Sequence, residues 1–227
     1  MNNPKIILAL DMTYESAINL AEKLDPASCI LKVGSELYTS SGPRIVEDLQ
    51  NKGFKIFLDL KFHDIPNTVA KAVYEAGSLG VWMLNVHASG GNRMLQEAKN
   101  SLMKLRKSPL LVAVTVLTSL SEEDSFKVGI KNIKDHSLSL AKLAKESGLD
   151  GVVCSSYELR DIKEVLGKDF LCVTPGIRLN QENEDQKRVS TPKKALEEGS
   201  DFLVIGREVT QHNNPPSALD EIISSIN

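Results

Sequence analysis

The sequence predicts an α/β fold, a single (β/α)8 barrel that spans residues 1–227. Eight short, β-branched apolar runs alternate with longer segments of helical spacing, at roughly 28 residues per strand–helix unit. No GxGxxG motif follows the first run, which ends instead in Asp11, and no stretch resembles a domain linker. A doubly wound open sheet shows the same alternation, but the count of eight favours the closed barrel.

The elements follow one another in a regular order. The predicted strands are the apolar runs 5–10, 28–33, 54–60, 81–86, 110–116, 150–154, 169–174 and 201–205. Between them, apolar residues recur at helical spacing, as in Ala17, Leu20, Ala21 and Leu24 or Val69, Ala72, Val73 and Ala76. Pro43 and Gly53 mark the start and end of one such helix. The longest irregular stretch, roughly 175–190, follows the seventh run, where a barrel carries loops over its catalytic face.

Composition excludes several classes of protein. The 27 Lys and Arg residues are outnumbered by 30 Asp and Glu, and no basic run suggests a nucleic-acid partner. No apolar stretch approaches the roughly 18 residues of a membrane span, and the first run is too short for a secretion signal. Three cysteines without a CxxC motif indicate neither a disulfide framework nor a zinc site. We therefore expect a cytoplasmic protein, whose ligand can still be a small phosphorylated molecule.

Charged residues end the first three predicted strands: Asp11, Lys32, Asp59, Lys61 and Asp64. In a barrel, the carboxyl ends of the strands form the catalytic face. Because side chains alternate along a strand, Asp59 and Lys61 should point to the same side. A single charge at a strand end is usually a solvated loop residue. Several on consecutive strands, with alternating sign, indicate a cluster that pairs internally or serves a ligand.

A second group of residues follows the seventh and eighth predicted strands. Arg178 ends the segment 174–178, and Gly206 and Arg207 end the eighth run. These loops are the usual phosphate site of this fold, although a simple turn with two surface arginines is the alternative. The segment 87–91 is either a ligand-contact loop or a helix start with Ser89 as N-cap. The four histidines lack the spacing of a zinc site.

The segment 59–68, Asp-Leu-Lys-Phe-His-Asp-Ile-Pro-Asn-Thr, resembles the signature of the orotidine 5'-phosphate decarboxylase family. Further blocks match that family in order along essentially the whole chain: residues 8–11, 31–34, 85–91, 116–119, 174–178, 185–186 and 204–207. A bare D-x-K-x-x-D is less specific, because related Mg²⁺-dependent sugar-phosphate decarboxylases and aldolases share it. The full set of blocks favours the first family.

The resemblance implies a TIM-barrel homodimer that converts orotidine 5'-phosphate to UMP and CO₂, with no cofactor and no metal. Lys61 resembles the proton donor, and Lys32, Asp59 and Asp64 would complete a charged network, with Asp64 reaching in from the partner subunit. The implied substrate contacts are Asp11, Lys32 and the partner's Thr68 on the ribose, Asp59 beside the departing carboxylate, Thr118 on the pyrimidine, and Arg178, Gln186, Gly206 and Arg207 on the phosphate and base.

The chemistry explains why such residue types are needed. Loss of CO₂ leaves a carbanion at C6, in the plane of the ring, so stabilisation must be electrostatic and arranged in advance. The Lys61 ammonium suits this role, because flanking carboxylates keep it charged. Two rivals stay open: a Mg²⁺-dependent enzyme with Asp59 and a nearby carboxylate as ligands, and a non-catalytic sensor. The intact set of Lys32, Asp59, Lys61 and Asp64 argues against the sensor.

Overall fold

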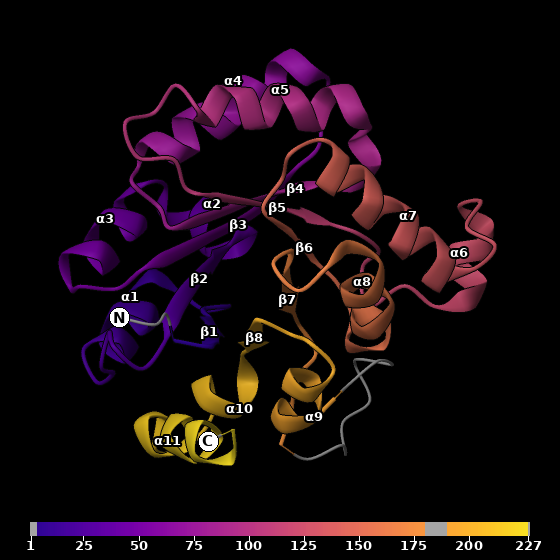
Figure 1. The fold of residues 1–227 in the computed structure, drawn as a ribbon. Helices are drawn as coiled ribbons and strands as arrows, with labels where there is room; N and C mark the ends of the chain where they lie inside the picture. Colours follow the sequence, from indigo (N-terminus) through magenta and orange to yellow (C-terminus); the bar gives the residue numbers. More distant parts are fainter. Residues whose placement is uncertain (1–3, 180–189, 227) are drawn as a thin grey trace.

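The structure, a computed structural model, describes residues 4–179 and 190–226. Its centre is a closed barrel of parallel strands in sequence order, in which the last strand pairs with the first (Figure 1). The strands are β1 (Ile6–Ala9), β2 (Ile30–Gly34), β3 (Ile56–Phe62), β4 (Met83–His87), β5 (Leu110–Val114), β6 (Gly151–Val153), β7 (Leu171–Thr174) and β8 (Phe202–Ile205). The predicted barrel is confirmed, and the open sheet is excluded.

Helices cover the outside of the barrel (Figure 1). They are α1 (Tyr14–Ala21), α2 (Ser35–Ser41), α3 (Arg44–Asn51), α4 (Pro66–Ser78), α5 (Asn92–Leu102), α6 (Glu122–Lys127), α7 (Ile133–Glu146), α8 (Leu159–Leu166), α9 (Pro192–Glu197), α10 (Arg207–Thr210) and α11 (Pro215–Ser225). The sequence predicts one helix after each strand. The structure adds a second helix after β2, β5 and β8, because those connections are long enough to hold two short helices.

The start of α5 differs from the sequence-based alternative. Ser89 lies in a 3₁₀ turn, η1 (Ala88–Gly90), and the N-cap position of α5 belongs to Gly91. Gly91 has a φ of 86°, a left-handed conformation that glycine adopts without a steric penalty. The backbone turn into this helix therefore depends on the glycine rather than on a serine cap.

The hydrophobic core has two layers. Side chains that point into the barrel form a compact cluster, which includes Ile7, Ile30, Phe57, Met83 and Val112. Side chains of the opposite strand faces pack against the helices in a larger cluster. The two layers follow from the period-2 alternation of strand side chains, since both faces of a parallel barrel strand are covered.

Two aspartates at the amino ends of strands connect neighbouring elements of the barrel through hydrogen bonds. Asp150, just before β6, accepts hydrogen bonds from Lys99 Nζ at 2.7 Å and from the Leu111 backbone N–H at 2.7 Å. Asp201, just before β8, repeats the arrangement with Lys163 Nζ at 2.7 Å and the backbone N–H at position 172, also at 2.7 Å. Each carboxylate thus joins a helix to the first residues of a neighbouring strand.

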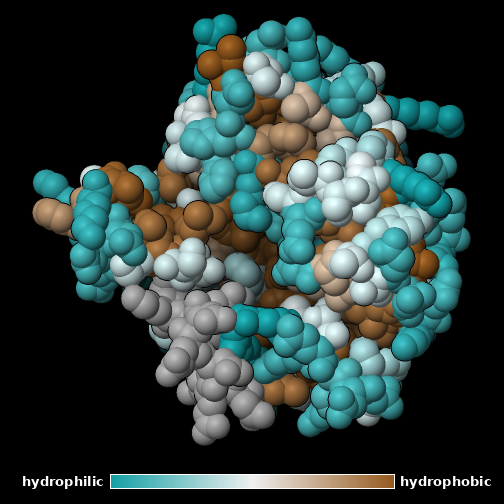
Figure 2. Space-filling model, turned by 180° about the vertical axis from the view of Figure 1, so that it is seen from behind, coloured by the Kyte–Doolittle hydropathy of each residue, from teal (hydrophilic) through white to brown (hydrophobic). Residues whose placement is uncertain are grey.

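The surface seen in Figure 2 is hydrophilic over most of its area, with hydrophobic side chains in a hollow near the centre of the view. Within residues 4–179 and 190–226, the helices are all too short or too polar to cross a lipid bilayer.

Candidate active site

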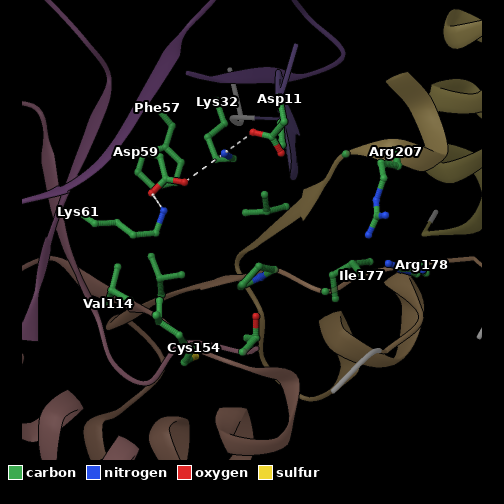
Figure 3. A pocket seen from close by; sticks show the side chains of 18 of the residues that line it. Asp11, Lys32, Phe57, Asp59, Lys61, Val114, Cys154, Ile177, Arg178 and Arg207 are labelled. Carbon is green, nitrogen blue, oxygen red and sulfur yellow. Dashed lines mark hydrogen bonds and ion pairs between the residues drawn. The ribbon is translucent and has the colours of Figure 1, made fainter. Parts of the chain in front are cut away.

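A cavity of about 1080 Å³ opens where the strands end. Its lining comes from the carboxyl ends of strands and the connections that follow them, together with apolar side chains from the barrel interior such as Phe57 and Val114. Figure 3 shows two charged groups on opposite sides of this space: Asp11, Lys32, Asp59 and Lys61 on one, and Arg178 and Arg207 on the other. A cavity of this size is large enough for a nucleotide-sized ligand.

Lysines and aspartates alternate along the first side of the cavity. Lys32 Nζ lies 3.4 Å from Asp11 Oδ1 and 3.1 Å from Asp59 Oδ2. The other oxygen of Asp59 accepts a hydrogen bond of 2.7 Å from Lys61 Nζ. The side chains of Lys32 and Asp59 are each 10% exposed, whereas Lys61 is 36% exposed and Asp11 is 65% exposed. The inner pair is therefore desolvated, and the Lys61 ammonium retains a face toward the cavity.

Opposing effects act on the pKa of Asp59. Burial raises this pKa. The charges of Lys32 and Lys61 and the hydrogen bonds from Lys61 and Asn85 lower it by more than burial raises it, so the pKa lies below its ordinary value of 3.8. Asp59 is consequently ionised at neutral pH.

Strand β3 reaches the cavity through an irregular segment. Leu58 pairs with Leu84 of β4, but the next pairing is Phe62 with Val86, so three residues of β3 face one residue of β4. Lys61 has a φ of 51°, which is the left-handed region that side chains with a Cβ rarely adopt. Both Asp59 and Lys61 line the cavity, as their spacing predicts, but they do so through a bulge and not through a regular strand.

The opposite side of the cavity carries two guanidinium groups. Arg178 follows β7, and its backbone N–H donates to the carbonyl of Ser190 at 3.0 Å, which closes a short parallel bridge. Gly206 and Arg207 lie where β8 passes into α10. Glu208, the next residue, accepts a 2.9 Å hydrogen bond from the backbone N–H of Leu179. Two arginines on one wall suit an anionic ligand group such as a phosphate.

The predicted site residues separate into three groups. The cavity lining includes Asp11, Lys32, Asp59, Lys61, Thr118, Arg178, Gly206 and Arg207. Asp64 and Thr68 are exposed and lie outside this lining, on the connection after β3 and in the first turns of α4. Gln186 lies outside the described residues. Residues 87–91, the other candidate loop, do not line the cavity either.

Among the polar residues near the cavity that the sequence analysis did not identify, two form side-chain hydrogen bonds. Asn85 is a fully buried residue of β4 that contacts both Asp59 and Lys61. Its signal in the sequence is a lone amide within the otherwise apolar run 81–86. The other is Glu208, which lines the cavity beside Arg207. A glutamate after a strand end carries no signal that separates it from an ordinary surface residue.

The two histidines nearest the network are a close pair. The rings of His63 and His87 lie 5.4 Å apart between centroids. Burial lowers the pKa of His87, and the neighbouring charges of His63 and Lys61 lower it further, so this ring is mainly neutral at neutral pH. Among the described residues, no group of three or more His, Cys, Asp or Glu side chains is arranged to hold a metal ion.

Comparison with known proteins assigns the chain to a family. The family model described as "Orotidine 5'-phosphate decarboxylase / HUMPS family" matches residues 4–222. An orotidine 5'-phosphate decarboxylase of Legionella pneumophila is 55% identical over 98% of this chain and 99% of its own length. One from Vibrio cholerae is 52% identical over the full length of both chains. A crystal structure of the orotidine 5'-phosphate decarboxylase of Lactobacillus acidophilus is similar with a TM-score of 0.86 and 40% identity over the full length of both chains. The chain therefore belongs to the orotidine 5'-phosphate decarboxylase / HUMPS family.

Proposed function

We propose that this chain decarboxylates orotidine 5'-phosphate to UMP and CO₂, the last step of UMP synthesis, without cofactor or metal. One observation carries the proposal: the cavity holds an ammonium–carboxylate chain on one side and two arginines on the other. That separation matches a nucleotide whose reacting ring and phosphate lie at opposite ends. Full-length relatives named for this activity support the same substrate.

The phosphate of the substrate would lie at Arg178 and Arg207, with Gln186 as a further predicted contact. Gly206 has no side chain, so the phosphate can approach the backbone there. These contacts are remote from the reacting bond, and their binding energy helps to offset the cost of ordering the site around the pyrimidine.

The ribose and the ring would occupy the space between the two charged sides. Asp11 and Lys32 would hydrogen-bond to hydroxyl groups of the ribose, and Thr118, on the connection after β5, would contact the ring. Phe57 and Val114 supply apolar walls. These apolar side chains exclude water from the ring, and the exclusion of water strengthens the electrostatic interactions of the charged residues nearby.

The proposed reaction needs one bond to break and one to form. The bond between C6 and the carboxylate carbon breaks, CO₂ leaves, and the electron pair stays on C6. The Lys61 ammonium stabilises that negative charge as it develops and then transfers a proton from Nζ to C6, which leaves a neutral amine that regains its proton from solvent. The 2.7 Å hydrogen bond to Asp59 fixes the position of this ammonium before the substrate arrives.

Asp59 has two roles in this proposal. It holds Lys61 in place, and its ionised carboxylate would lie beside the carboxylate that the substrate loses. Repulsion between the two anions disappears as the substrate carboxylate becomes CO₂, which lowers the barrier. Lys32 compensates the charge of Asp59 from the side away from Lys61.

A homodimer with shared sites is the second part of the proposal. Asp64 and Thr68 are exposed and outside the cavity of their own chain, and Ile65 between them is 66% exposed. All three side chains are therefore accessible to a second copy of the chain. We propose that the partner's Asp64 completes the charged network and that the partner's Thr68 contacts the ribose.

Mixed dimers test this sharing directly. When chains with Asp59→Ala and chains with Asp64→Ala are combined, half of the sites in a mixed dimer should contain both wild-type residues. We expect activity to return on mixing two inactive homodimers. If mixing restores no activity although mixed dimers form, Asp59 and Asp64 serve the site of the same subunit.

The activity itself is tested by adding orotidine 5'-phosphate and following the pyrimidine absorbance with EDTA present. We expect conversion to UMP at the same rate with and without the chelator. Loss of activity with EDTA would favour the Mg²⁺-dependent decarboxylase or aldolase. Binding without turnover would favour the sensor. A cytoplasmic location stays a prediction, in keeping with three free, buried thiols in a reducing compartment.

A further inference from the structure

Asn85 lies in the interior of the barrel but outside the cavity. It is 0% exposed and sits between Met83 and His87 on the inward face of β4. A buried primary amide is costly unless its donor and acceptor groups both find partners. Asn85 finds them on two residues of β3, both of which line the cavity.

The two hydrogen bonds of Asn85 fix the orientation of its amide. Oδ1 accepts from the backbone N–H of Lys61 at 2.8 Å, and Nδ2 donates to Asp59 Oδ1 at 2.6 Å. A backbone N–H needs an acceptor and a carboxylate needs a donor, so the flipped amide would break both contacts. The amide is therefore matched to this pair of neighbours in one orientation.

The backbone geometry explains why a side chain is needed there. The three residues Asp59–Lys61 face Asn85 alone, because the β3–β4 register shifts between Leu58 and Phe62. A shifted register removes ladder hydrogen bonds, and Lys61, which lies in the shifted segment, has a left-handed φ. Asn85 Oδ1 takes the place of the missing backbone acceptor.

The same amide also sets the rotation of the Asp59 carboxylate. Asp59 Oδ1 accepts from both Asn85 Nδ2 and Lys61 Nζ, which leaves Oδ2 facing Lys32 at 3.1 Å. Removal of the Asn85 side chain takes away the hydrogen bond that fixes the rotation of the Asp59 carboxylate. It also takes away the acceptor for the backbone N–H of Lys61. Both changes displace the ammonium from the place where the cavity would present C6.

We propose that Asn85 is a positioning residue for the decarboxylation, one that acts by holding Asp59 and Lys61 in their reactive geometry without touching the substrate. The inference rests on the proposed function, since it takes Lys61 as the proton donor. Such a residue should affect the chemical step more than binding, because the arginines that hold the phosphate lie on the other side of the cavity.

The first test compares Asn85→Ala with Val86→Ala. Val86 is the next residue of β4, is 0% exposed, and packs outward among the helices. We expect Asn85→Ala to lower kcat about 100-fold with KM within about 3-fold of the wild type, since small misplacements of reacting groups have effects of this size. We expect Val86→Ala to lower the thermal unfolding midpoint but to keep the wild-type kcat.

The second test uses Asn85→Asp, which keeps the size and the acceptor for the Lys61 N–H. Two adjacent carboxyl groups cannot both ionise readily, so they share a proton at lower pH, and the protonated form restores the donor to Asp59. The charged or titratable groups that face this pair are Lys32, Lys61 and His87, with His63 beyond. We expect kcat relative to wild type to be higher at about pH 5.5 than at about pH 8.

The outcomes separate the two proposals. If the wild-type chain forms no UMP, the proposed decarboxylase function fails and this inference fails with it. If the wild type is active, the inference alone is overturned by a folded Asn85→Ala with wild-type kcat, or by an Asn85→Asp whose kcat relative to wild type does not change with pH. A loss of kcat in Val86→Ala as large as in Asn85→Ala would also overturn it, because general damage to β4 would then be the cause.

Discussion

Lysine–aspartate contacts occur at both ends of the barrel strands, and the two ends use them differently. At the amino ends, Asp150 and Asp201 each accept from one lysine and from one backbone N–H of a neighbouring strand. At the carboxyl ends, Asp59 forms ion pairs with two lysines and accepts a hydrogen bond from a buried amide, so its partners among the described residues are side chains. The residue types are the same, but their partners differ.

This difference indicates what each group is built to do. At the amino ends, the carboxylate satisfies a donor of the main chain, so the contact stabilises the sheet itself. At the carboxyl ends, the charged groups pair with one another and with a buried amide, and one ammonium keeps an open face toward a cavity. Ion pairs with an unused face beside a cavity are typical of functional sites. We therefore expect substitutions at the amino ends to lower mainly the stability of the protein and substitutions at the carboxyl ends to lower mainly its activity.

The largest effect is expected for Lys61→Ala. This change should abolish detectable UMP formation, because it removes both the charge that stabilises C6 and the donated proton. The free energy of unfolding should change by only about 1 kcal/mol or less, since Asp59 keeps Lys32 and Asn85 as partners. Chromatographic detection of UMP and a urea titration measure the two quantities, and appreciable turnover by the variant would remove Lys61 from the mechanism.

Arg207→Ala tests the other side of the cavity. Loss of a charge-assisted contact with the phosphate should raise KM for orotidine 5'-phosphate about 10- to 100-fold. The same change should have little effect on any turnover of orotidine, which has no phosphate. Steady-state kinetics with both compounds measure this difference, and an equal loss with each would contradict the role in phosphate binding.

Asp201→Ala is the matched change at the amino ends. It leaves the Cys172 backbone N–H without its side-chain acceptor and takes the carboxylate away from the Lys163 ammonium, which keeps the carbonyls of Lys168 and Phe170. The free energy of unfolding should therefore fall by about 1–3 kcal/mol. The kcat measured well below the unfolding temperature should equal that of the wild type. A folded variant with a strongly reduced kcat would show that the two ends are not independent.

The smallest effect concerns pH. The pKa of Asp59 lies below its ordinary value of 3.8, so the carboxylate stays ionised as the pH falls from about 8 to about 5. Its contribution to stability is fully present above the unfolded pKa and is lost as the pH falls through the folded pKa. A pH profile of kcat should therefore show no acid limb from Asp59 in this range. An acid limb near pH 5 that disappears in Asp59→Asn would contradict the prediction.

Much of the barrel and part of the site can be predicted from the sequence, for physical reasons. The alternation of apolar runs and helical segments predicts the eight strands, and the period of 2 places Asp59 and Lys61 together, beside Lys32. The additional helices after β2, β5 and β8 are not predicted, because short amphipathic segments within a connection look like one helix. The predicted roles of Asp64 and Thr68 in the partner subunit's site come from the resemblance alone, since nothing in their own pattern points to a second subunit.

The parts that could not be predicted depend on pairing between strands. The bulge in β3 is a property of its register with β4, and a run such as 54–60 reads as a regular strand. The role of Asn85 can be recognised only when that register is known, because the register places Asn85 opposite Asp59 and Lys61. Glu208 likewise contacts Leu179, a residue far away in the sequence, because the two residues follow the paired strands β7 and β8.

Incubation with orotidine 5'-phosphate in D₂O containing EDTA tests the account most directly, with Lys61→Ala as the matched control. The wild-type chain should release CO₂ and yield UMP that carries deuterium at C6, visible as the loss of the H6 signal in the proton NMR spectrum, and the variant should yield none. A wild-type chain that releases no CO₂, or a variant that forms the same labelled UMP at a comparable rate, would contradict the claim that a lysine ammonium in this cavity delivers the proton.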